Sequence, residues 1–161
     1  MDLSVFASEW TLIFLFAGLA ENWPGLIVSG LFLAVCRNRN IAWGEATAYT
    51  CYFFAGAVVA HLQLRIALGI PLGEYGLSGH GAEVVVALLF VIALAAAYRR
   101  LHKSPALIML AVLTLTLGVL QFSEIRTLIL NYCARVYAFA CIIVPIGALL
   151  RTFWRADHSL R

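Results

Sequence analysis

Glu21 and Asn22 place an acid next to an amide inside a long apolar stretch of the sequence. Pro24 and Gly25 follow almost directly, and this pair interrupts helices. A break at membrane depth frees backbone carbonyl and amide groups, which are tolerated there only against protein or in a wet cavity. The pattern therefore predicts either a hinge or ion-coordinating break within the membrane, or a loop at its outer surface.

His61 and Arg65 stand one helical turn apart in the next apolar stretch, so their side chains can share a partner. A histidine at this depth could carry protons. The alternative is structural, with His61 bonded to a neighbouring carbonyl and Arg65 extending to the outer interface. Glu45 lies on the other face of the same stretch. Polar residues on both faces indicate a helix surrounded by protein or beside a watery path.

Asn131 and Arg135 share a face of the last apolar stretch, beside a pair of alanines at 134 and 138. Small residues at this spacing let helices approach closely, so the stretch predicts a helix interface. Arg135 lies well inside the stretch, where a charge is costly without a counter-ion. We expect it to pair with a carboxylate, for which Glu21 and Glu124 are available. Such a pair can be architectural or can take part in passage or binding.

Catalytic chemistry finds little support in the residue pattern. A Gly-x-Ser-Gly string at 76–79 has no later histidine at membrane depth to act as its base. His61 has no second axial ligand for haem. Glu21, Glu45 and Glu124 fall on separate segments, and the four cysteines are too dispersed for a zinc site or a disulfide framework. We therefore predict no enzymatic activity, no cofactor and no metal.

Apolar helices must position these side chains. The chain is 63% hydrophobic and 12% charged, with a mean hydropathy of +0.95, which is outside the range of soluble domains. A helix needs about 20 apolar residues to cross a bilayer, and about five segments approach or exceed that length. The sequence thus predicts an all-α polytopic membrane protein, a single domain over 1–161 folded as a compact bundle. The predicted spans are 11–36, 41–70, 82–98, 105–122 and 127–150.

The first span is interrupted at residues 21–25. It can be read as one broken span, or as a re-entrant hairpin with arms at 3–20 and 24–36. The second arm would hold only about 13 residues, which is short for a crossing, so we favour the broken span.

Basic residues set the expected orientation, because loops rich in Lys and Arg stay in the cytoplasm. With five alternating helices, most of them fall on one side, which places the N-terminus outside and the C-terminus in the cytoplasm. We expect a multi-pass protein of the inner (plasma) membrane, whose net charge of +3 reflects this sidedness and not an affinity for nucleic acid. The basic residues on that side are Arg37, Arg39, Arg99, Arg100, Lys103, Arg151, Arg155 and Arg161.

Two functions fit this pattern. In the first, the chain is a subunit of a homo-oligomeric channel or pore, and its intramembrane polar groups line or gate the path. In the second, it is a non-catalytic interaction module, such as an assembly factor, accessory subunit or immunity-type inhibitor, that docks on another membrane protein. The partners are then the lipid bilayer and either further copies of the chain or another membrane protein. A channel would expose the polar groups to water, whereas a module would keep them paired and dry.

Overall fold

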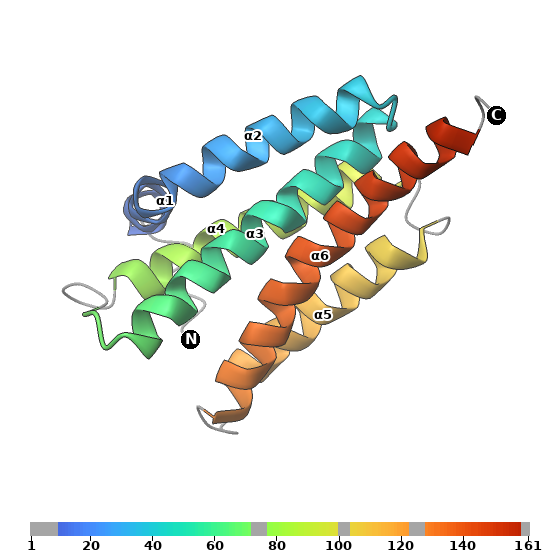
Figure 1. The fold of residues 1–161 in the computed structure, drawn as a ribbon. Helices are drawn as coiled ribbons and strands as arrows, with labels where there is room; N and C mark the ends of the chain where they lie inside the picture. The colour runs from blue at the N-terminus through green and yellow to red at the C-terminus, as the bar shows by residue number, and fades with distance from the viewer. Residues whose placement is uncertain (1–9, 72–76, 100–103, 123–127, 159–161) are drawn as a thin grey trace.

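The structure is a computed structural model, and it describes residues 10–71, 77–99, 104–122 and 128–158. All regular secondary structure in these residues is helical, as the sequence predicts. Six helices follow one another along the chain and pack into one bundle (Figure 1). They are α1 (Trp10–Glu21), α2 (Trp23–Asn38), α3 (Trp43–Ala67), α4 (Leu77–Ala97), α5 (Pro105–Phe122) and α6 (Leu128–His158).

The predicted break in the first span is confirmed, and it falls at Asn22. Pro24 lies in the first turn of α2, where its missing amide hydrogen removes no helical bond. The axes of the two helices differ by 76°, so α1 neither continues α2 nor folds back along it. Figure 1 shows α1 almost end-on, while α2 runs across the view.

α3 is the central helix of the bundle and contacts α2, α4 and α6. Its buried residues include Tyr49, Tyr52, Phe54, Val58 and Gln63, which point to different sides of the helix. α3 thus packs against protein on several sides, which is one of the two arrangements that the sequence predicts for it. The sequence reason is that polar residues lie on both faces of the helix, so that neither face suits lipid.

The predicted interface on α6 is also confirmed. Ala134 and Ala138 are buried, and α6 crosses α3 where Gly56 lies. A Cβ added at Gly56 would lie 2.8 Å from Cys141 Cβ and 3.0 Å from the Ala138 carbonyl oxygen. The two backbones approach this closely only because the contact is made of small residues.

From α2 to α6, successive helices run in opposite directions, so that the end of α2, the start of α3, the start of α5 and the end of α6 lie at one end of the bundle (Figure 1). There the Arg39 guanidinium lies 3.7 Å from the centre of the Phe153 ring, which joins the end of α2 to α6. The Tyr49 and Ser104 hydroxyls, 3.3 Å apart, join α3 to the residue before α5. We call this the basic end; at the opposite end, α5 and α6 splay away from α3 and α4 (Figure 1).

Three helices, α3, α4 and α6, are long and apolar enough to cross a membrane, and the bent α1–α2 pair makes a fourth if it counts as one span. α5 is apolar but shorter. Large apolar side chains cover the outer surface of the bundle, among them Leu31, Val91, Val119 and Phe139. These features suit a helical membrane bundle, and the five-span count remains a prediction.

We expect Gly56→Ala to destabilise the fold by about 1–3 kcal/mol, because the new methyl group has no space between α3 and α6. The matched control is Gly147→Ala in α6, where an added Cβ meets nothing within 4 Å. That change should stabilise the helix by about 0.5–1 kcal/mol. Unfolding by SDS titration from mild detergent measures both values. Equal effects of the two variants would contradict the close contact.

Candidate functional site: polar contacts between α1 and α3

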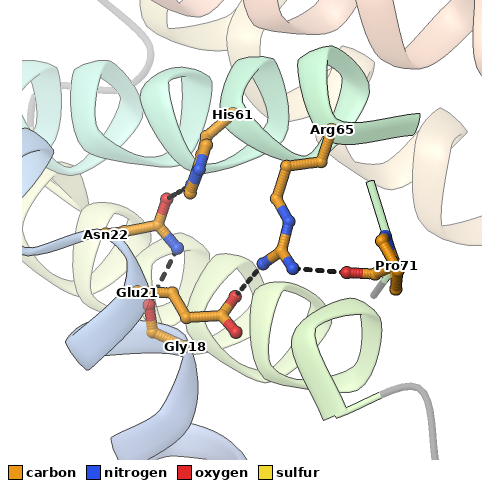
Figure 2. Close-up of polar contacts among 6 residues, drawn as sticks. All are labelled: Gly18, Glu21, Asn22, His61, Arg65 and Pro71. Carbon is orange, nitrogen blue, oxygen red and sulfur yellow. Dashed lines mark hydrogen bonds and ion pairs between the residues drawn. The ribbon is translucent and has the colours of Figure 1, made fainter. Parts of the chain in front are cut away.

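A contact between two glycines seats α1 on α4. A Cβ added at Gly18 would lie 2.5 Å from the Gly81 carbonyl oxygen, so any larger residue would push the helices apart. The Phe14 and His80 rings also meet, with 5.4 Å between their centres. This contact brings the end of α1 to the last turns of α3. There the Glu21–Asn22 pair meets His61 and Arg65 (Figure 2).

Glu21 and Arg65 form an ion pair across this junction. Arg65 Nη1 donates to Glu21 Oε2 at 2.9 Å. The Arg65 side chain is 18% exposed and the Glu21 side chain is 34% exposed. Arg65 Nη2 also donates to the Pro71 carbonyl oxygen at 2.5 Å (Figure 2). The guanidinium thus ties the end of α1 to α3 and to the chain that leaves α3.

Asn22 and His61 form a second link, one helical turn deeper along α3. His61 Nδ1 lies 2.9 Å from Asn22 Oδ1, and Asn22 Nδ2 donates to the Gly18 carbonyl oxygen at 2.8 Å. Because the amide nitrogen of Asn22 is already the donor to Gly18, its oxygen must accept. His61 Nδ1 therefore carries the proton in this arrangement. Asn22 is only 7% exposed, and its bond to Gly18 is buried while its bond to His61 is partly buried.

At the break, the backbone amide and carbonyl groups of Asn22 both form hydrogen bonds within the chain. The Asn22 amide donates to the Leu19 carbonyl at 3.2 Å, and the Asn22 carbonyl accepts from the Leu26 amide at 3.1 Å. Together with the side-chain bonds, this geometry matches a fixed bend more closely than an ion-coordinating gap. Glu21 bonds to Arg65 and Asn22 bonds to His61, and we call these four residues the α1–α3 cluster.

A separate polar contact links α3 to α6. Gln63 Nε2 donates to Asn131 Oδ1 at 3.4 Å. Asn131 is among the candidate residues that the sequence predicts, whereas Gln63 is not. The signal that could have identified it is its place near the C-terminal end of α3, opposite the start of the antiparallel α6.

Two predicted residues lie apart from both contacts. Glu45 is partly buried in the first turn of α3 at the basic end, where a carboxylate also suits the positive end of the helix dipole. Arg135 is exposed on α6. Of the two carboxylates expected to be available to Arg135, Glu21 pairs with Arg65 instead. Glu124, the other expected partner, lies outside the described residues.

No cluster of three or more His, Cys, Asp or Glu side chains that could hold a metal ion occurs in the described parts of the chain. The cysteines Cys36, Cys51, Cys133 and Cys141 are free thiols.

A double-mutant cycle with Glu21→Gln and Arg65→Gln should give a coupling energy of about 1 kcal/mol, between the values typical of exposed and of buried ion pairs. SDS-titration unfolding of the wild type, both single variants and the double variant measures it. The control cycle pairs Glu21→Gln with Arg99→Gln at the basic end and should be additive. Zero coupling between Glu21 and Arg65 would show that the pair does not hold α1.

The His61 ring should carry its proton on Nδ1 at a pH where it is neutral, and ¹⁵N NMR of labelled histidine in micelles reads this directly. Asn22→Leu removes the acceptor and should abolish the preference for Nδ1. It also leaves the Gly18 carbonyl without its side-chain donor and costs about 1–3 kcal/mol of stability. The matched control is Asn131→Leu, which removes an amide that does not contact His61. A ring protonated on Nε2 in the wild type would refute the assigned bond.

Comparison with protein-family models, curated proteins and solved structures gives no match to this chain. In the chain's own geometry, Glu21 pairs with Arg65 and Asn22 with His61, whereas Arg135 is exposed on the apolar surface of α6.

Proposed function

We propose that this protein is a multi-pass membrane protein that acts as a non-catalytic interaction module, docking through α6 on an acidic transmembrane helix of another protein. The observation that carries the proposal is the exposed position of Arg135 within an apolar surface.

The outer face of α6 supplies the docking surface. Tyr132, Val136 and Phe139 are exposed around Arg135, and we call these four residues the Arg135 face. Arg135 lies seven residues after the start of α6, about 10 Å along the helix. A charge at that depth facing lipid is costly, and a partner carboxylate would offset the cost.

The chain's own described carboxylates do not offer such a partner to a second copy. Glu21 pairs with Arg65 and Glu83 lies 3.3 Å from His80. Glu45 is at the basic end and Asp157 is in the last turn of α6, both far along the bundle from the start of α6. Among the described residues, charge complementarity therefore favours a different protein, with an Asp or Glu on an otherwise apolar helix.

The internal pairing of the α1–α3 cluster supports the module over the channel. A lumen would need polar atoms directed at water, whereas Glu21, Asn22, His61 and Arg65 bond to one another. The orientation we propose places the basic end in the cytoplasm of a cell with a plasma or inner membrane, because Arg37, Arg39, Arg99 and Arg151 gather there. The Arg135 face then lies in the outer half of the bilayer.

Site-specific photo-crosslinking in native membranes tests the docking. With benzoylphenylalanine at Phe139, we expect one discrete adduct with a second protein. Arg135→Leu should reduce its yield at least tenfold, because removing one side of an interfacial charge pair costs about 2–5 kcal/mol. Arg135→Lys retains the charge and should keep most of the adduct.

The matched control places the crosslinker at Leu31, an equally apolar exposed position on α2. Arg99→Leu controls for the loss of one positive charge elsewhere. Adducts with lipid alone, or an adduct that Arg135→Leu leaves intact, would contradict the proposal. A homo-oligomer by light scattering, together with ion flux in liposomes that Arg135→Leu alters, would favour the channel instead.

A further inference from the structure

Exposed arginines from three parts of the sequence lie at the basic end of the bundle. They come from the end of α2, the end of α6 and the chain just after α4, and they are Arg37, Arg39, Arg151 and Arg99. The end of α4 lies beside the start of α3, because a Cβ added at Gly44 would collide with the Ala96 carbonyl oxygen. The fold thus gathers positive charge that is dispersed along the chain.

Aromatic rings hold two of these guanidinium groups in place. The Arg39 guanidinium lies 3.7 Å from the centre of the Phe153 ring. The Arg37 guanidinium lies 5.0 Å from the centre of the Trp43 ring, and its Nη1 donates to the Ile41 carbonyl oxygen at 3.1 Å. A guanidinium over a ring uses its flat face, so N–H groups around its edge stay available to an acceptor. Phosphate oxygens suit this planar set of donors.

The described side chains do not neutralise this charge. The ion pairs among them join Arg65 to Glu21 and His80 to Glu83, and both pairs lie at the opposite end of the bundle. Glu45 is partly buried in the first turn of α3, and no ion pair within the described part of the chain joins it to an arginine of the basic end. An anionic partner therefore gains attraction from several positive charges at once.

A row of apolar side chains on α2 leads to Arg39. Ile27, Leu31 and Val35 are exposed and follow one another at intervals of four residues, and Arg39 continues the series. Residues at this spacing form one ridge along a helix, and we call the three apolar residues the α2 ridge. From Ile27 to Arg39 the helix advances about 18 Å, slightly more than half of the roughly 30 Å hydrocarbon thickness of a bilayer. An acyl chain can therefore lie on the ridge while its headgroup reaches the arginine.

Exposed aromatic side chains complete this surface. Trp43 and Tyr98 lie at the basic end with more than half of their surface exposed. Tryptophan and tyrosine are enriched where the hydrocarbon of a membrane meets the headgroups. A nucleic acid or an acidic soluble protein would use the positive charge but neither the ridge nor the rings. A phospholipid uses all three.

We propose that the basic end binds a phospholipid with an anionic headgroup. Its phosphate contacts Arg37 and Arg39, and its acyl chain lies along the α2 ridge. The site is independent of the docking proposal, because Arg135 lies about 24 Å from Arg151 along α6. Loss of lipid binding therefore leaves docking through the Arg135 face testable, and loss of docking leaves lipid binding testable.

Native mass spectrometry of the full chain in detergent measures the binding. The probes are phosphatidylglycerol and phosphatidylcholine with identical acyl chains, titrated separately. We expect phosphatidylglycerol to bind more tightly, because each arginine near an anionic headgroup raises the affinity about fivefold. Arg39→Gln should therefore lower the affinity for phosphatidylglycerol about fivefold and the affinity for phosphatidylcholine much less. Arg39→Lys retains the charge and should keep most of the affinity.

Arg135→Gln is the matched control, because it removes an exposed arginine that lies outside the basic end. It should leave the affinity for phosphatidylglycerol unchanged. A large excess of soluble glycerol phosphate should not displace the lipid, since it offers nothing to the α2 ridge.

Photo-crosslinking tests the position of the lipid with all four arginines in place, so it does not depend on how well Arg39→Gln folds. Benzoylphenylalanine replaces Val35 in the full chain, which is then placed in nanodiscs that contain both lipids. Adducts with phosphatidylglycerol should exceed its share of the bilayer about threefold or more. The control position is Val119 on α5, which is exposed and far from the basic end, and its adducts should match the bilayer composition.

Equal affinities for the two lipids, or equal losses in Arg39→Gln and Arg135→Gln, would overturn the site. Displacement by glycerol phosphate would show that the arginines bind phosphate groups alone, and would overturn the assignment to a lipid. Equal enrichment at Val35 and Val119 would overturn the position on the α2 ridge.

Discussion

The ion pair between Glu21 and Arg65 is the interaction on which the arrangement of the N-terminal third depends. Charged groups in an apolar bundle are stable only when each finds an opposite charge and enough hydrogen bonds. Arg65 meets this requirement with the Glu21 carboxylate and the Pro71 carbonyl. The bond can form only if α1 turns sharply away from α2, and the Gly18–Gly81 contact then fixes that turn against α4.

The helices are held together at the basic end and diverge at the opposite end, and the contacts between their side chains differ accordingly. At the basic end, Tyr49, Ser104 and the Arg39–Phe153 contact bring α2, α3, α5 and α6 together. At the opposite end, the Gln63–Asn131 bond is the polar link between α3 and α6, and α5 and α4 diverge. The difference leaves a cavity of about 490 Å³ lined by α3, α4, α5 and α6, without any break in these helices.

Local sequence patterns predicted the helices, the break before Pro24 and the small-residue contact on α6. These features depend on neighbouring residues: a proline ends a helix, and alanines four residues apart share a face. The partners of charged groups depend on distances between helices far apart in sequence, and there the sequence was less informative. Glu21 was one of two carboxylates expected to be available to Arg135, yet it pairs with Arg65, because α1 packs on α4 beside the last turns of α3. The importance of Gln63 was missed because an amide on a mixed helix face carries no local signal.

The packing of α1 against α3 and α4 has a consequence for how the bundle assembles during synthesis. Gly81, against which Gly18 packs, and Arg65, which pairs with Glu21, are both synthesised after Gly18 and Glu21. Until α3 and α4 have been made, α1 has an acid at its end and an apolar surface without a binding site. α1 can therefore reach its final position only after α3 and α4 have been synthesised and have begun to pack together.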